Sequence, residues 1–364
     1  MKIKDILTEI EKLAPLPYAE DFDNVGLLVG DKNASVKGVL IAHDTLEEVV
    51  QEAIDKKCNL IISYHPIIFK GLKSLTGKTY VERAVIKAIQ HDIAIYATHT
   101  ALDNSFDGMN AMICKKLNLK NREILIPQAK TIKKLVTYVP KKQADRVRQA
   151  IFDAGAGNIG NYDNCSFNLS GLGSFKGNEA SDPTVGEKGE IHFEEEIQLN
   201  ITFPRDRESA VIQALLSTHP YEEVAYEITE LENKNQHIGI GMIGELDQAV
   251  SETDFLKNLK ETFNLSVIRH SRLLDKKIGK VAVLGGSGSF GIGAAKQAGA
   301  DIYVTGDLKY HDFFMAENQI VLADIGHYET EQFTKELLQA YLTNKFRSFA
   351  IVLSEENTNP IQYT

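Results

Sequence analysis

Cysteine is scarce in this sequence. Cys58, Cys114 and Cys165 are the only three among 364 residues, and no two of them form a Cys-X-X-Cys pair. Disulfide frameworks and zinc knuckles use paired cysteines at short, regular spacings, so the sequence predicts neither. The three residues are instead typical of free, mostly buried thiols in a reducing compartment.

Long apolar runs and an excess of positive charge are also lacking. No apolar stretch approaches the roughly 18–20 residues of a membrane span. Residues 1–15 alternate charged and apolar side chains, which predicts an amphipathic helix rather than a signal peptide. The formal net charge is −10, which disfavours a general nucleic-acid binder because phosphate neutralisation needs a basic surface. We therefore expect a cytoplasmic protein with no membrane partner.

The N-terminal part of the chain, residues 1–128, has the pattern of an α/β protein. Hydrophobic residues make up 43% of the whole chain, as in ordinary globular proteins, and its length predicts about two or three domains. Short apolar runs predict strands at 38–44, 59–65 and 93–99, and periodic stretches predict helices at 46–57, 80–90 and 109–117. This alternation indicates βαβ units and a mostly parallel sheet.

The C-terminal part, residues 237–364, repeats the same alternation. Strands are predicted at 280–288, 301–307, 319–327 and 349–354, and helices near 290–298, near 309–317 and across 329–343. Two α/β halves with matching patterns indicate one core domain formed from both ends of the chain.

The middle part, residues 129–236, has a different rhythm. Strands are predicted at 133–140, 162–171, 195–204 and 222–231, helices at 142–155 and 207–219, and an exposed loop at 172–193. The order β-α-β-β-α-β is that of a ferredoxin-like fold. We therefore predict an α+β insert that interrupts the α/β core, as a chain tolerates when the ends of the insert lie close together.

Four potential metal ligands stand where predicted strands end. His65 follows one strand and Asp103 follows the next, while His327 and Glu331 lie four residues apart between a third strand and a helix. Open α/β sheets bind ligands at the carboxyl edge of the strands. An i,i+4 pair places both side chains on one face of a helix.

Each of these residues has a simpler explanation when taken alone. A single histidine can be a hydrogen-bonded structural residue, a loop aspartate a turn residue, and a glutamate at a helix start a partner of the macrodipole. Together, imidazole and carboxylate groups suit zinc, iron, manganese or nickel. Glu331 could also bridge two ions, as a carboxylate does in dinuclear hydrolases.

Two further segments follow strands of the C-terminal half. Asp307, Lys309 and His311 could contact an anionic substrate or orient metal ligands, although Asp307 is also a good helix cap. The glycine-rich run at 285–291 could cradle phosphate with its backbone N–H groups, but it lacks the Lys-Ser/Thr ending of a P-loop. A tight turn between strand and helix explains its glycines equally well.

Six motifs together resemble the GTP cyclohydrolase 1 type 2 homolog family, the NGG-interacting-factor-three-like proteins. They are EDFDNVGLLVG at 20–30, HP at 65–66, HTALD at 99–103, GGSGS at 285–289, TGDLKYH at 305–311 and DIGHYETE at 324–331. The middle segment resembles the PII/CutA-like insert of longer bacterial members. The resemblance implies a toroidal homohexamer with two-metal sites. It implies that His65, Asp103 and Glu331 bind one ion, and that Glu331 and His327 bind the other.

The sequence departs from the family pattern at the site itself. The family commonly has His-His-Pro, and Tyr64 replaces the first of these histidines. A neutral phenol is a poor ligand, so the sequence predicts one tight ion and a second that is weak, absent or completed by water. Tyr64 and His99 could instead orient ligands or contact substrate. His43 stands where a small or apolar residue is more usual, and the sequence assigns it no role.

Two functions from different classes agree with these features. The first is a metal-dependent hydrolase that acts on a nucleotide-like or phosphorylated small molecule. The second is a metal-carrying or regulatory hexamer without turnover, whose insert binds partners or small molecules. The family name refers to GTP ring opening, but no residue in the sequence selects guanine.

Overall fold

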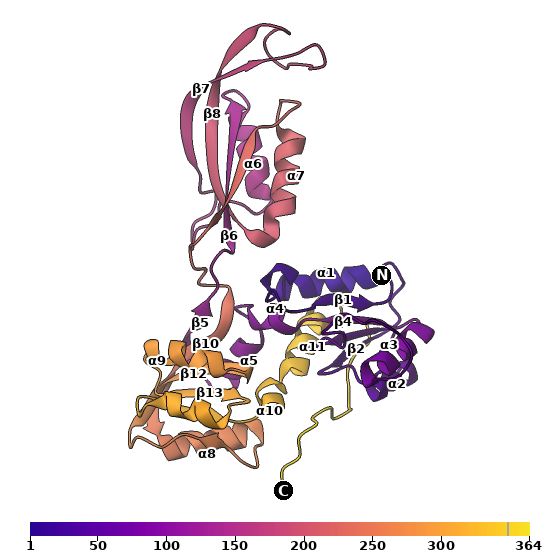
Figure 1. The fold of residues 1–364 in the computed structure, drawn as a ribbon, viewed down its shortest axis with the longest axis vertical. Coiled ribbons are helices and arrows are strands. Elements are labelled where there is room, and N and C mark those ends of the chain that lie inside the picture. The colour runs from indigo at the N-terminus through magenta and orange to yellow at the C-terminus, as the bar shows by residue number, and fades with distance from the viewer. Residues whose placement is uncertain (348) are drawn as a thin grey trace. The chain divides into compact units, whose positions relative to one another are not determined.

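The computed structural model describes residues 1–347 and 349–364 (Figure 1). The chain divides into two compact units. The first unit, which we call the core, joins Met1–Pro127 to Gln236–Thr364, and the second, which we call the insert, is Gln128–Asn235. An α/β core interrupted by an α+β insert is the predicted fold class, and it is confirmed.

One sheet of the core belongs mainly to the N-terminal half. Its order is β1-β4-β3-β2-β15. The strands are β1 (Gly26–Val29), β2 (Val39–Ala42), β3 (Leu60–Ser63), β4 (Ala94–Ala97) and β15 (Ile351–Leu353). β1 is antiparallel to β4, and the other neighbours are parallel. Every residue of β2, β3 and β4 is buried, which explains why these strands read as continuous apolar runs.

The helices of this half are α1 (Ile3–Leu13), α2 (Glu47–Asp55), α3 (Tyr80–Gln90), α4 (His99–Asp103) and α5 (Met109–Lys116). A 3-10 turn covers Leu16–Tyr18. The first helix buries its apolar stripe of Ile3, Ile6, Leu7, Ile10 and Leu13, so it is amphipathic, as the charge alternation predicted.

The second sheet of the core belongs mainly to the C-terminal half. Its order is β11-β14-β13-β12-β10-β5. The strands are β5 (Lys120–Pro127), β10 (Gly239–Ser251), β11 (Arg269–His270), β12 (Lys277–Ser287), β13 (Ile302–Gly306) and β14 (Val321–Asp324). β12, β13 and β14 are parallel, whereas β10 is antiparallel to both β12 and β5.

The two halves of the core exchange strands. β15, from the end of the chain, pairs with β2, and β5, from the N-terminal half, pairs with β10. One hydrophobic cluster also includes side chains from both halves, among them Tyr64, Phe255 and Leu338. Neither half can therefore complete its sheet or its core without the other.

The helices of the C-terminal half depart from the prediction in three places, the first of which is that the helix at Glu252–Phe263 was not predicted. They are α8 (Glu252–Phe263), α9 (Ile292–Gln297), α10 (His327–Glu331) and α11 (Thr334–Lys345), with 3-10 turns at Ser289–Gly291 and Tyr310–Ala316. The helix predicted near 309–317 is thus a 3-10 turn, which ends at Glu317 in the left-handed conformation.

The prediction of a single helix across 329–343 is wrong, because two helices, α10 and α11, cover this segment. Side chains bind backbone carbonyls at the break: Thr334 Oγ1 donates to Glu331 O at 2.7 Å and Gln332 Nε2 donates to Glu329 O at 2.9 Å. Such local bonds compete with the helical ladder. The first of the two helices nevertheless begins at His327, which places Glu331 one turn further along the same face.

The insert is a four-stranded antiparallel sheet in the order β7-β8-β6-β9. Its elements are β6 (Ile132–Pro140), α6 (Ala144–Asp153), β7 (Phe167–Lys176), β8 (Ile191–Pro204), a 3-10 turn (Arg205–Arg207), α7 (Glu208–Thr218) and β9 (Tyr226–Leu231). This is the ferredoxin-like arrangement, as predicted. The loop predicted at 172–193 is too long, because Lys176 pairs with Ile191 and only 177–190 remain outside the β7–β8 hairpin.

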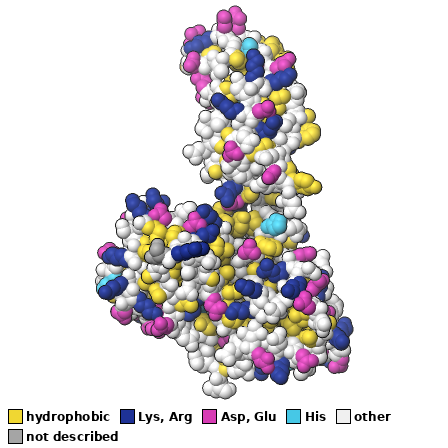
Figure 2. Space-filling model, turned by 180° about the vertical axis from the view of Figure 1, so that it is seen from behind, with side chains coloured by type: hydrophobic (Ala, Val, Ile, Leu, Met, Phe, Trp, Pro, Cys, Tyr) yellow, Lys and Arg dark blue, Asp and Glu magenta, His cyan; other side chains and the backbone are white. Residues whose placement is uncertain are grey.

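Charges are interspersed on one face of the surface (Figure 2), and the cysteines are unpaired. On the face shown in Figure 2, acidic and basic side chains are interspersed rather than gathered by sign. Cys58 and Cys114 are buried, Cys165 is half-buried, and all three are free thiols. In the described part of the chain, no helix combines the length and apolarity that crossing a membrane requires.

We propose that the insert can be removed without unfolding the core. Pro127 pairs with Gly239 on neighbouring strands, and Asn235 N donates to Gln128 O at 2.9 Å. Because the two ends of the insert lie side by side, a short Gly/Ser linker in place of 128–235 should leave a folded core that binds metal. Circular dichroism melting and metal analysis would test this. Insoluble protein from every linker length would show that the core depends on the insert.

Candidate metal centre

Three imidazoles converge on one oxygen of a buried carboxylate. Glu331 Oε2 lies 3.3 Å from His65 Nε2, 3.3 Å from His327 Nε2 and 3.4 Å from His43 Nε2. Glu331 is 3% exposed, and this oxygen has no hydrogen bond of good geometry. A buried charged oxygen without a hydrogen bond is costly. The arrangement therefore suits a cation bound by this oxygen and the imidazole nitrogens.

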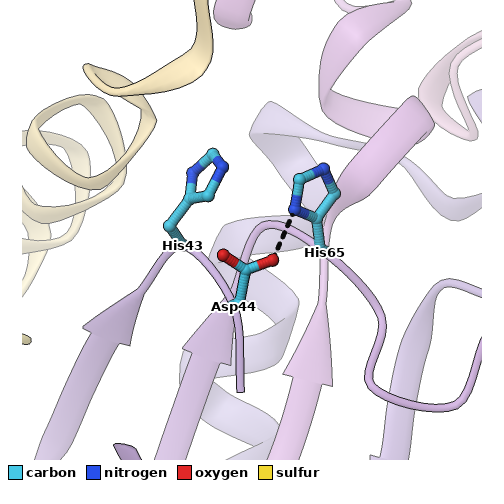
Figure 3. A group of neighbouring side chains, drawn as sticks. All are labelled: His43, Asp44 and His65. Carbon is cyan, nitrogen blue, oxygen red and sulfur yellow. Dashed lines mark hydrogen bonds and ion pairs between the residues drawn. The ribbon is translucent and has the colours of Figure 1, made fainter. Parts of the chain in front are cut away.

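The site is built where parallel strands end. His43 and Asp44 directly follow β2, and His65 follows β3 (Figure 3). His327 and Glu331 are the first and last residues of α10, which follows β14 of the second sheet. Strand ends from both sheets thus supply the cluster, in keeping with the rule for ligand sites in α/β folds.

Carboxylates contact the Nδ1 atoms of two imidazole rings, whose Nε2 atoms face Glu331. His65 Nδ1 lies 2.8 Å from Asp44 Oδ1, and His327 Nδ1 lies 2.7 Å from Asp307 Oδ2. The Asp44 carboxylate itself accepts a 2.5 Å hydrogen bond from Thr358 Oγ1. An acceptor at Nδ1 favours the tautomer that carries its proton there and leaves the Nε2 lone pair for a metal ion.

Electrostatics tie the imidazoles to the central carboxylate. Burial alone would raise the pKa of Glu331, but His327, His43 and His65 hold that pKa well below its usual range. Burial would likewise lower the imidazole pKa values. Asp44 and Glu331 nevertheless raise the pKa of His65 to about 10, and Glu331 and Asp307 raise that of His327 to about 9. A divalent ion would take the place of these protons.

The donor set fits a divalent ion. His65, His327 and Glu331 each offer one ligand atom, and these atoms lie within 4.8 Å of one another. Neutral imidazole and carboxylate are the donors that zinc, iron, manganese and nickel take in proteins. Glu331 Oε2 lies among these nitrogens, where a cation would take over the charge compensation that protonated imidazoles otherwise provide.

Asp103 lies deeper and is held by Tyr64. The Tyr64 hydroxyl donates to Asp103 Oδ1 at 2.5 Å, and both side chains are buried. Burial, together with the charge of Glu331, raises the pKa of Asp103 to about 7, against the lowering effect of His99 and His65. Burial and Asp103 hold the pKa of Tyr64 well above its usual range. Tyr64 is therefore a neutral donor to a carboxylate that a nearby cation would stabilise.

His99 stands at the edge of the cluster. Its Nδ1 lies 2.8 Å from Asp23 Oδ1, and its ring centroid is 5.3 Å from that of His65. Asp23 also accepts from Thr100 N at 3.1 Å. His99 thus has the same carboxylate support as His65 and His327, although it lies outside the group of converging ligand atoms.

The glycine-rich run packs against the site, and the amides of its first two glycines are already bonded. Gly285 N donates to Asn110 Oδ1 at 3.0 Å, and Gly286 N donates to Thr330 Oγ1 at 2.8 Å. A Cβ on Gly286 would lie 2.4 Å from Glu331 Oε1. These contacts favour the tight-turn interpretation over a phosphate cradle.

The structure separates the predicted site residues into two sets. His65, His327 and Glu331 converge, Asp103 and Tyr64 form a buried pair beside them, and Asp307 orients His327. Lys309 and His311 lie exposed on the 3-10 turn, where His311 packs on Tyr310. Their contact with a substrate stays a prediction.

Sequence reasoning missed His43, Asp44 and Asp23 as parts of the site. The signal for the first two was available, because His-Asp directly follows an apolar strand in the same way as His65 does. Asp23 belongs to the run at 20–30, but no local pattern shows that it holds His99.

Comparison with known proteins identifies the family of the chain. The family model for Duf34/NIF3 (NGG1p interacting factor 3) matches residues 1–360. The chain belongs to the Duf34/NIF3 family. Its relative in Bacillus subtilis (strain 168), named GTP cyclohydrolase 1 type 2 homolog, is 39% identical over 99% of this chain and 98% of its own length. The resemblance predicted from the six motifs is therefore confirmed.

Two solved structures match over the whole chain. A Bacillus cereus protein related to NIF3 has a TM-score of 0.84 at 37% identity, covering 100% of this chain and 99% of its own. Staphylococcus aureus protein SA1388 has a TM-score of 0.79 at 35% identity with the same coverage. The core and the insert are thus both part of the fold of these relatives.

Proposed function

We propose that this Duf34/NIF3 protein is a metal-dependent hydrolase that acts on a nucleotide-like or other phosphorylated small molecule. His65, Asp103, His327 and Glu331 would hold one or two divalent ions. The observation that carries the proposal is the convergence of carboxylate-backed imidazoles on the buried oxygen of Glu331. This arrangement is typical of metal sites that do chemistry.

The protein side chains have separate tasks in such a reaction. A bound divalent ion supplies an activated water and polarises a phosphoryl or carbonyl oxygen. Glu331 provides the negative charge at the centre, and Asp44 and Asp307 hold His65 and His327 in orientation. His99, fixed by Asp23, stands where it can move a proton to or from a substrate.

A substrate with negative charge agrees with the surroundings of the site. Lys309 and His311 are exposed on the turn that follows Asp307, which itself contacts His327. The curated relatives carry the name GTP cyclohydrolase 1 type 2 homolog, so nucleoside triphosphates belong in any substrate screen. The residues of the site do not distinguish guanine from other bases.

A metal-replete turnover screen tests the proposal. Zinc-, manganese-, iron(II)- and nickel-loaded protein would be assayed with nucleotides and phosphoesters, beside Glu331→Gln as the matched inactive variant. We expect turnover that requires both the metal and Glu331. If wild-type protein that holds metal turns over no substrate faster than Glu331→Gln, the hydrolase proposal fails and the non-catalytic function remains.

A cavity in the insert supports the second candidate, a metal-carrying or regulatory homohexamer. The cavity has a volume of about 550 Å³ and is lined mainly by β7, together with Glu196 and Gln198 of β8, Tyr138 and Tyr221. Tyr221 Oη donates to Glu196 Oε1 at 2.8 Å in its wall. Partly apolar cavities of this size bind small molecules. Two results together would favour this candidate. The insert would bind a small molecule while the core shows no turnover, and native mass spectrometry would show a hexamer.

A further inference from the structure

We infer that His43 is a metal ligand, which supplies from the end of β2 the imidazole nitrogen that residue 64 does not provide. The inference rests on the proposed metal centre, but it does not depend on any catalytic turnover. Its consequence is a second ion position beside the first, for which His43 would supply the imidazole nitrogen and Glu331 the shared carboxylate.

His43 and Tyr64 occupy neighbouring places at one sheet edge. β2 and β3 are parallel with Ala42 opposite Ser63, so the next residue of each strand emerges at the same level. Tyr64 N donates to Ala42 O at 3.2 Å, and the rings of His43 and Tyr64 stack with centroids 5.5 Å apart. An imidazole at either position therefore reaches the same region of the site.

Tyr64 is already engaged elsewhere. Its hydroxyl donates to Asp103 Oδ1 at 2.5 Å, and its side chain is fully buried. That hydrogen bond directs the phenol oxygen toward the carboxylate of Asp103 and away from that of Glu331. His43, in contrast, offers its imidazole to Glu331, because its Nε2 lies 3.4 Å from Glu331 Oε2.

His43 is buried without the hydrogen bonds that an imidazole needs. It is 3% exposed, and its Nδ1 has no hydrogen-bond partner. A buried polar atom left unpaired is costly and calls for an explanation. An apolar side chain would fill this space without that cost, whereas an imidazole offers a nitrogen to a cation.

The ligand atoms fall into two overlapping groups. His65, His327 and Glu331 form one, and His43, Asp44 and His65 form the other, each with its ligand atoms within 4.8 Å of one another. Figure 3 shows the second group, in which the Asp44 carboxylate points toward His65. Because His65 belongs to both groups and its free lone pair can serve only one ion, a second ion would take its imidazole nitrogen from His43. The added imidazole also favours zinc, iron(II), cobalt or nickel over magnesium or calcium.

Metal content of a leucine variant tests the inference. His43→Leu places an apolar side chain of similar size in the buried position and removes both ring nitrogens. After zinc loading and dialysis, we expect the variant to lose about one equivalent of metal per chain relative to wild type. His91→Leu, which changes an exposed histidine after α3, is the matched control and should retain the wild-type content.

A rescue variant separates ligation from packing. In His43→Leu/Tyr64→His, the imidazole returns on the neighbouring strand, so the lost equivalent of zinc should return as well. Cobalt(II) absorption provides a second measurement, because the visible bands report the number and type of ligands. A purely structural role for His43 would not be restored by an imidazole at position 64.

The outcomes distinguish this inference from the proposed metal centre. Wild-type protein that binds no zinc or cobalt would overturn both. Wild-type protein that binds metal, with unchanged content and cobalt spectrum in His43→Leu, would overturn the role of His43 alone. If His43→Leu does not fold, His43→Gln, which keeps a polar side chain of similar length, decides by the same two measurements.

Discussion

Glu331→Gln is expected to lose nearly all bound metal, whereas His327→Ala should keep an ion at the remaining ligands. The amide preserves the shape of the side chain and removes its charge. Three imidazole nitrogens lie 3.3–3.4 Å from the Glu331 oxygen, so every ion position near them depends on this carboxylate. Without it, the remaining carboxylates are Asp103, which accepts from Tyr64, and Asp44 and Asp307, which are engaged with imidazole Nδ1 atoms. Divalent ions depend on carboxylates that are free to bind them.

The fold should survive Glu331→Gln. His65 and His327 owe their raised pKa values partly to Glu331, so these imidazoles can lose their protons when the negative charge is removed. No buried cation is then left without a partner, which limits the cost that breaking a buried ion pair usually carries. Thermal melting in the presence of a chelator would measure this directly.

Glu329→Gln is the matched control for this experiment. Glu329 lies on the same short helix, but its Oε1 accepts from Asn359 Nδ2 at 3.2 Å rather than facing the imidazoles. It should keep the wild-type metal content. Equal metal loss in Glu331→Gln and His327→Ala would remove the bridging role of Glu331. Unaltered content in both variants would contradict the ligand assignment as a whole.

Most of the fold could be predicted because its signals are local. The strands β2, β3 and β4 are short buried runs that end in polar residues, and the helices between them are periodic. The pairings of β15 with β2 and of β5 with β10 could not be predicted, because no local pattern tells a strand which distant strand it joins. These long-range pairings bring the two halves together.

The candidate site shows the same limit. His65 could be predicted because it stands just beyond the carboxyl end of β3. Glu331 could be predicted because it lies four residues after His327, which places both on one face of a helix. The place of His43 was missed because it depends on contacts with Glu331 from a distant helix and with Tyr64 from the next strand. Asp23, which holds His99, is likewise supplied by a segment far away in the sequence.

Gly286→Ala is expected to disturb the metal centre as well as the fold. Gly286 has φ +69°, and a Cβ there would lie 2.4 Å from Glu331 Oε1. The left-handed backbone alone costs an L-residue about 1–2 kcal/mol. Glu331 is buried, with a Thr334 hydroxyl bonded to its backbone carbonyl, so its carboxylate can move away only by leaving the imidazoles.

Gly299→Ala isolates the backbone cost from the effect on the metal. Gly299 has φ +72°, and an added Cβ there would meet no atom within 4 Å. Denaturant unfolding with a chelator present should show a loss of about 1–2 kcal/mol in Gly299→Ala and a larger loss in Gly286→Ala, where the contact with Glu331 adds to the backbone cost. Only Gly286→Ala should also bind zinc more weakly, by roughly 10–100-fold, as when the surroundings of a ligand are disturbed. If both variants bind zinc as the wild type does, Glu331 does not need its present position to hold the ion.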